Sequence, residues 1–219
     1  MRNLLYLVFY VLLFSCSVKK DNKLSNTHAT SISTDSKLTE MEGNIINDFI
    51  DFELKKDRYK NYKDFEIVVI EEALQKHKSI ETYKYSRDEW ISMNRINKNG
   101  DLENRFLLDT LQIKKMEIKL EKEDVYKWKI SDFKYFKVNL LKYEELKTII
   151  NTGLYSKFSS RIIIYLSKPL IIDENNAFIS FEVGNGQLGF KSINHFTVLM
   201  RKVNNKWEQV NYYYDGVFN

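Results

Sequence analysis

The sequence has little of the chemistry on which common cross-links and metal sites depend. Among its 219 residues there are one cysteine, Cys16, one proline, seven glycines and three histidines. A single cysteine excludes an intramolecular disulfide, so the fold must be held by its hydrophobic core. The histidines, His28, His77 and His195, include no pair at metal-ligand spacing on a helix. We therefore expect no zinc site built from protein ligands alone.

The sequence also lacks the phosphate-binding and nucleophile motifs of common enzymes. No Gly-Lys-Thr phosphate loop, no Gly-x-Gly-x-x-Gly and no Gly-x-Ser-x-Gly occurs, so we expect no cofactor and no serine-hydrolase chemistry of that kind. Positive charge is not concentrated either, because 34 Lys and Arg are balanced by 30 Asp and Glu, and Lys alternates with Glu in residues 114–123. Nucleic-acid binders gather one sign of charge on one face. We therefore expect no nucleic-acid partner.

The first fifteen residues have the parts of an export signal. Arg2 supplies a positive n-region, an uninterrupted apolar run extends from Leu4 to Phe14, and the small residue Ser15 follows. The run has eleven residues, whereas a membrane-spanning helix needs about 20. We interpret residues 1–15 as a signal peptide and not as a transmembrane anchor.

The segment Leu13-Phe14-Ser15-Cys16 resembles the lipobox of bacterial lipoproteins. In that family the cysteine becomes the lipidated first residue, since its thiolate can capture a diacylglyceryl group. The resemblance implies lipid attachment at Cys16, a membrane partner, and a place in the bacterial cell envelope on the outer membrane. The alternative is that Cys16 is an apolar residue at the end of an uncleaved leader.

Residues 16–38 are rich in Ser, Thr, Asn and Lys and poor in large apolar side chains. Such a composition cannot bury enough apolar surface to offset the entropy of ordering it, so we expect a flexible, lipid-anchored tether. Its Lys19-Lys20-Asp21 run resembles the charged signal with which some Bacteroidota send lipoproteins to the cell surface. A solvated linker is the alternative, and the periplasmic and surface faces both remain open.

We expect residues 39–219 to form a single globular domain whose first half contains helices and short strands. A helix over 39–56 begins at Thr39, where Glu42 has capping-box spacing. The other expectations, in chain order, are a strand at 65–70, either strand or helix at 71–77, an irregular stretch at 78–105 with Trp90 and Ile91 buried and a turn at 97–101, either helix or strand at 107–123, strand spacing at 126–130, and a helix at 143–151 ending near Gly153.

The last third predicts an antiparallel meander. Residues 161–166 are apolar on both faces, as in a central strand, and Pro169 follows where pairing should end. The predicted meander is completed by a turn at 173–176, alternating apolar residues over 177–183, a strand at 195–203, a reversal at Asn204-Asn205 and a strand at 207–214. The fold class is therefore α+β, with an antiparallel C-terminal meander and two to three helices packed on one of its faces.

Residues 160–214 also carry a resemblance. Leu166-Ser167-Lys168-Pro169-Leu170, the Asp-Glu-Asn-Asn turn, the Ala-Phe-Ile-Ser-Phe strand and the Lys-Trp strand are similar to the C-terminal half of uncharacterised lipoproteins of Bacteroidota. The resemblance implies no catalytic or binding residue, because none is assigned in that group.

One glycine-rich loop and one histidine are the candidate binding residues. The loop Gly184-Asn185-Gly186-Gln187-Leu188-Gly189 uses three of the seven glycines, which permits close approach of backbone amides to a ligand. The alternative is a wide hairpin loop. If the strand ends meet, His195 and Asp215 would form a base and its orienting partner; the alternative is a packed edge histidine. The full candidate set is Asn185, Gln187, Lys191, His195 and Asp215.

Three hypotheses follow for function. The first is a lipid-anchored envelope protein without catalysis, whose domain binds a protein or glycan partner. The second is an envelope hydrolase that uses His195 with an acidic partner, and the third is an immunity or inhibitor lipoprotein with one tight partner. Whether the protein is an enzyme stays undecided, with binding preferred, and the sequence leaves its oligomeric state open.

Overall fold

A computed structural model describes residues 37–93, 105–154, 156, 159–185 and 192–216, without the side chains of residues 185 and 192–194. The signal peptide, Cys16 and all but the end of the tether lie outside the described residues, as do the turn predicted at 97–101 and the candidates Gln187 and Lys191.

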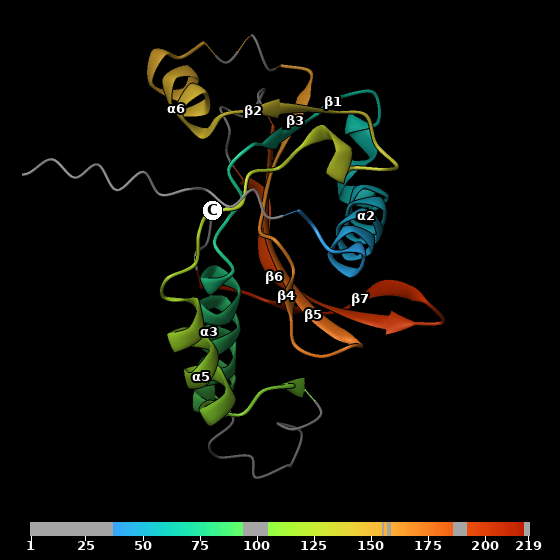
Figure 1. Cartoon of the computed structure of the whole chain (residues 1–219). Helices are drawn as coiled ribbons and strands as arrows, with labels where there is room; N and C mark the ends of the chain where they lie inside the picture. Colours follow the sequence, from blue (N-terminus) through green and yellow to red (C-terminus); the bar gives the residue numbers. More distant parts are fainter. Residues whose placement is uncertain (1–36, 94–104, 155, 157–158, 186–191, 217–219) are drawn as a thin grey trace, which may run out of the picture. The chain divides into compact units, whose positions relative to one another are not determined.

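The described part is a mixed α+β structure built on a seven-stranded sheet (Figure 1). The strands, in chain order, are β1 (Glu66–Ile70), β2 (Val138–Leu141), β3 (Arg161–Leu166), β4 (Leu170–Ile171), β5 (Asn176–Asn185), β6 (Ser192–Val203) and β7 (Lys206–Tyr213). Their order across the sheet is β2-β1-β3-β5-β6-β7, with β4 paired to β5.

The predicted meander is confirmed, and it continues into a parallel part that the sequence pattern did not predict. Strands β3, β5, β6 and β7 pair antiparallel in succession, and Asn204 and Asn205 turn with φ of 49° and 64°. Strand β1 pairs parallel with both β2 and β3. Parallel neighbours need crossover connections, and the helices between β1 and β3 lie in those crossovers.

The α-helices of the described residues are α2 (Glu40–Leu54), α3 (His77–Met93), α5 (Thr110–Leu120) and α6 (Tyr143–Thr152), with short 3-10 turns at η1 (Asp57–Tyr62) and η2 (Ile130–Asp132). The predicted capping box of α2 is present, because the Thr39 hydroxyl accepts from the Glu42 amide while the Glu42 carboxylate accepts from the Thr39 amide. Gly153 ends α6 with φ of 67°, also as predicted.

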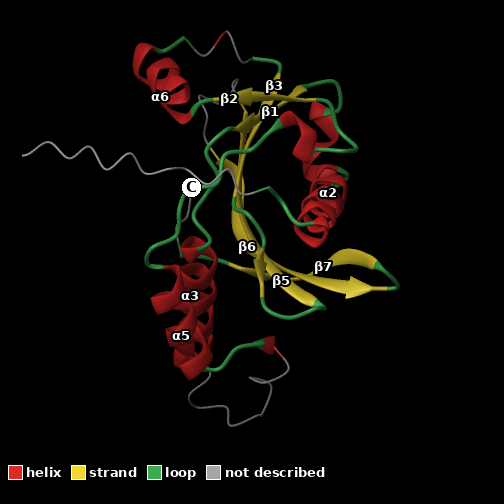
Figure 2. Ribbon diagram, viewed as in Figure 1, coloured by secondary structure: helices red, strands yellow, loops and turns green. Residues whose placement is uncertain are grey.

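The prediction that the helices pack on one face is wrong, because they cover both (Figure 2). Helix α2 packs on one face through the large core cluster that contains Ile179 and Phe181. Helices α3 and α5 pack on the other face, against Phe178 and Leu199 of the same strands. Helix α6 packs farther along that second face, against Val68, Ile70 and Ile163 of β1 and β3. Successive residues of a strand point to opposite faces of the sheet. Because both sets of residues include apolar side chains here, each face must be covered by helices.

The prediction of an irregular stretch at 78–105 is also wrong over residues 78–93, because α3 occupies residues 77–93, and residues 94–104 lie outside the described residues. The buried residues of α3 are Ser79, Ile80, Thr82 and Tyr83, so its inner face lacks the aliphatic stripe that marks a helix in a sequence. Trp90 and Ile91 are only partly buried.

The structure also settles the conformation of residues 71–77 and 107–123, for which the sequence left helix and strand open. Residues 110–120 are helical. Glu72 and Leu74 form isolated bridges, and α3 begins at His77. The strand spacing at 126–130 reflects the burial of Tyr126 and Trp128, and Lys127 makes one bridge to Glu72.

Candidate functional site

A strip of polar side chains lies on the sheet face that α3 and α6 share, between the parts that each helix covers. Glu182 of β5 is paired with His195 of β6 and with Tyr165 of β3. One step along the same face, Ser180 is paired with Thr197. Alternate residues of a strand point to the same face, so the pleat places these side chains in one strip next to the start of α3.

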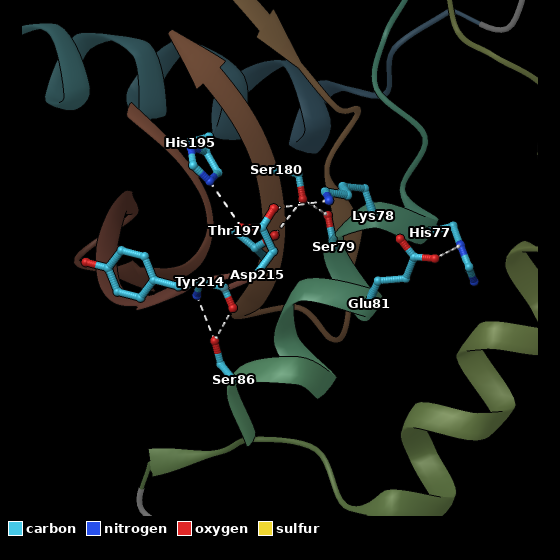
Figure 3. A network of polar contacts seen from close by, with 10 residues as sticks. All are labelled: His77, Lys78, Ser79, Glu81, Ser86, Ser180, His195, Thr197, Tyr214 and Asp215. Atoms are coloured by element: carbon cyan, nitrogen blue, oxygen red, sulfur yellow. Dashed lines mark hydrogen bonds and ion pairs between the residues drawn. The ribbon is translucent and has the colours of Figure 1, made fainter. Parts of the chain in front are cut away.

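His195 and Asp215 meet there, as the sequence hypothesis required. His195 Nε2 lies 3.1 Å from Asp215 Oδ1, and Lys78 Nζ, in the first turn of α3, lies 3.2 Å from Asp215 Oδ2 (Figure 3). The side chains of His195 and Asp215 are 18% and 16% exposed, so the carboxylate bridges two basic groups in a largely buried setting. Lys78 had no distinguishing signal in the sequence, because it falls in the stretch where no helix was predicted.

A chain of buried hydroxyl groups continues from this cluster beneath α3 (Figure 3). Ser180 Oγ lies 2.9 Å from Ser79 Oγ and 2.6 Å from Thr197 Oγ1. The Ser180 amide also donates to Ser167 Oγ at 3.0 Å. These hydroxyls hydrogen-bond to one another, which is how buried polar groups are accommodated. The chain ties α3 to β5 and β6.

The C-terminal segment is held on α3 at the position that places Asp215. Ser86 Oγ accepts from the Tyr214 amide and donates to the Tyr214 carbonyl, each at 2.7 Å. Gly216 has φ of 76°, and a Cβ at this position would lie 2.2 Å from the Tyr85 hydroxyl. The backbone conformation favours glycine here, and a larger residue would also displace the Tyr85 ring.

Space beside His195 is small, whereas space beside Asp215 is large. A cavity of about 10 Å³ touches His195, Ser180 and Asp215, which is room for about one water molecule. A groove of about 760 Å³ runs along α3, and its lining includes Lys78 and Asp215. A ligand of ordinary size therefore fits the groove and not the histidine side of the cluster.

The groove along α3 carries more negative than positive charge. Its carboxylates are Glu81, Asp88, Glu89, Glu117 and Asp215, against the lysines Lys78 and Lys84 and His77. Lys84 and His77 are already engaged with Glu117 and Glu81, at 3.1 Å and 3.2 Å. Tyr85 and Met93 add apolar surface, with 44% and 72% of each residue exposed.

A third pocket, of about 300 Å³, lies between α6 and the strip and also includes Glu182. The rings of Tyr143 and Tyr165 stack in it with centroids 5.6 Å apart. Burial, together with the nearby Tyr143, Glu182 and Glu72, raises the pKa of Tyr165 to about 12. The lining of this pocket is mostly apolar, and Glu182 is the charged residue among the described residues that form it.

The other predicted candidates are less defined. Asn185 ends β5, but its side chain is among those not described, and Gln187 and Lys191 lie outside the described residues.

In the Tyr212 to Tyr214 run, Tyr213 is buried under α3, whereas Tyr212 and Tyr214 pack on Phe196 on the opposite face. The run is thus divided between two faces, as alternation along a strand requires.

Comparison with known proteins finds no matching family model, no matching curated protein and no matching solved structure. Within the residues that the structure describes, no helix is long and apolar enough to cross a membrane. The same residues contain no cluster of three His, Cys, Asp or Glu side chains placed to hold a metal ion.

Proposed function

We propose that this is a lipid-anchored envelope protein whose single domain, residues 39–219, binds a partner protein without catalysis. The groove along α3 is the observation that carries the proposal. Its surplus of carboxylates, with Tyr85 and Met93 exposed, suits a segment that presents basic and apolar side chains. A neutral glycan fits less well, because sugars bind on aromatic faces and, among the described residues, Tyr85 is the one Phe, Tyr or Trp that lines the groove.

The contact between His195 and Asp215 favours the second candidate, a hydrolase. Two features support binding over catalysis. The cavity at His195 has a volume of about 10 Å³, which is too small for a substrate. The second oxygen of Asp215 is engaged by Lys78, so the carboxylate also serves to hold the C-terminal segment on α3.

Site-specific cross-linking tests the partner proposal. A benzophenone amino acid placed at Tyr85 of the full-length chain in living cells is expected to give a discrete protein adduct on irradiation. The double change Asp88→Lys with Glu89→Lys should lower its yield about fivefold or more, because it reverses charge at exposed groove positions. A single adduct would favour an immunity or inhibitor protein with one tight partner.

Two controls make this result specific. The same amino acid at Tyr135, which is 67% exposed and outside the groove, should give no matching adduct. Reversal of two exposed carboxylates on α6, Glu144→Lys with Glu145→Lys, should leave the Tyr85 adduct unchanged. Absence of any adduct at Tyr85, or equal losses in both double variants, would refute the proposal.

The anchor has a separate test. We expect mass spectrometry of the mature protein to find an N-terminal peptide that begins at Cys16 and carries the mass of a diacylglyceryl group, since that residue ends the predicted lipobox. The Cys16→Ala variant should lack it. Protease treatment of intact cells then distinguishes the two faces of the membrane, because only a surface-exposed domain would be digested. A mature peptide that begins upstream of residue 16 would contradict the proposal.

A further inference from the structure

Another cavity, of about 450 Å³, lies on the α2 face of the sheet, where α2 ends and η1 leads into β1. Its floor is apolar and adjoins the main core. The residues that form this floor share aromatic or aliphatic side chains and are Leu54, Tyr59, Tyr62, Phe65, Ile67, Phe136 and Ile162. Ligand sites in proteins are typically cavities of about 300–1,000 Å³ with mostly apolar walls and a few polar groups, and this cavity fits that description.

The rim of the cavity is basic. Four lysines line it, against one carboxylate, Asp57. Lys56 is engaged by the buried Glu53, and Lys55 pairs with Asp51 at 2.7 Å. The other two, Lys60 and Lys63, are exposed and form no ion pair with any residue in the described part of the chain.

The combination of floor and rim selects one class of ligand. A cavity floor of buried and half-buried apolar side chains favours a hydrocarbon chain, and the ammonium groups of Lys60 and Lys63 at the entrance favour an anionic head. An inorganic anion would leave the apolar floor uncovered, and a chain with a cationic head would be repelled by the lysines. We propose that this cavity binds a single-chain anionic amphiphile, such as a fatty-acid carboxylate, with the chain on the floor and the head between Lys60 and Lys63.

A photoreactive probe tests the proposal on the full-length chain in dialysed cell lysate. The probe is a twelve-carbon fatty acid with a diazirine on its chain and an alkyne for detection. We expect saturable labelling of peptides from residues 54–67 or of the peptide that contains Phe136. Dodecanoate should compete, whereas dodecyltrimethylammonium, which has the same chain and the opposite charge, should compete about tenfold less well or worse.

Matched variants test the role of the two lysines. Lys60→Glu with Lys63→Glu should lower labelling about tenfold or more, because an attraction is lost and a repulsion replaces it. The pair Lys114→Glu with Lys115→Glu, on the exposed side of α5, should leave labelling unchanged. Thermal unfolding of both variants checks that each is folded.

Three outcomes would overturn the proposal. These are labelling that does not saturate, labelling that both double variants reduce equally, and equal competition by the cationic amphiphile. None of them affects the groove along α3, because the cavity and the groove lie on opposite faces of the sheet and share no residue.

Discussion

Replacing Lys56 by alanine is expected to lower the free energy of unfolding by about 3 kcal/mol, because it removes the cation from a buried carboxylate. Glu53, near the end of α2, is 2% exposed. Lys56 Nζ contacts the Glu53 carboxylate and the Tyr212 hydroxyl, and it lies 2.6 Å from Gln209 Oε1. The side chains of Lys56 and Glu53 are 18% and 2% exposed, so this ion pair is one that solvent screens little. Burial lowers the pKa of Lys56.

The same cluster joins α2 to the last strand of the sheet. Gln209 Nε2 donates to Glu53 at 3.2 Å, and the Tyr59 hydroxyl donates to the same carboxylate at 3.0 Å. The Lys56 ammonium also lies 4.6 Å from the centroid of the Tyr212 ring. Loss of Lys56 therefore removes contacts to two elements that are far apart in the chain.

Urea unfolding of three variants measures this effect. Lys55→Ala, at the exposed neighbouring position, should change stability by less than about 0.5 kcal/mol, because exposed ion pairs contribute little. The double variant Glu53→Gln with Lys56→Met should recover most of the loss, since it removes both charges and keeps the volume. A loss below about 1 kcal/mol in Lys56→Ala would show that Glu53 does not depend on this cation.

The parts of the fold that were predictable are those whose signals are local. The capping box of Thr39 and Glu42 needs residues three positions apart, and Gly153 ends α6 through its own backbone conformation. The strands of the meander alternate strongly and follow one another in the chain, so their pattern and their order both indicate antiparallel pairing.

The parts that were missed depend on partners far away in the sequence. Helix α3 buries Ser79 and Thr82 as well as Ile80 and Tyr83, and the hydroxyl of Ser79 is satisfied by Ser180 of β5, 101 residues later. The parallel pairing of β1 with β2 and β3 gives no local pattern. A polar inner face is stable only once its hydrogen-bond partners are in place. A prediction from the sequence alone therefore treats such a face as exposed.

The candidate site likewise has a part that the sequence predicted and a part that it did not. The approach of His195 to Asp215 was expected on the condition that two strand ends meet, and they do. Lys78 and Glu182 were not expected, because one lies on the unpredicted helix and the other becomes part of the strip only through the pairing of β5 with β6. The groove along α3 could not be inferred without that helix.

Raising the pH from 10 to 12 is expected to destabilise the protein strongly, because burial raises the pKa of several tyrosines. The pKa values of Tyr83, Tyr165 and Tyr212 are raised to about 12, and that of Tyr213 is raised as well. An unfolded tyrosine ionises near pH 10. Above that pH the unfolded state loses protons that the folded state keeps, so stability is complete below pH 10 and falls as the pH rises toward 12.

Tyr83 is the residue on which this prediction can be tested. It is 0% exposed, and its hydroxyl accepts from the Leu108 amide at 2.7 Å. The raised pKa of Tyr83 accounts for about 2 kcal/mol of the free energy of unfolding that is lost between pH 10 and 12. Lys56 offsets little of this loss, because its lowered pKa adds stability only until the pH reaches about the unfolded value of 10.5.

The Tyr83→Phe variant should start from a lower stability at pH 8, because the buried Leu108 amide loses its acceptor. Its stability should then fall by about 2 kcal/mol less than that of the wild type between pH 10 and 12. Urea unfolding at each pH measures both quantities, and Tyr135→Phe, at a position that is 67% exposed, is the matched control. If the two variants and the wild type lose the same free energy over this range, the alkaline transition does not arise from the burial of Tyr83 between α3 and the sheet.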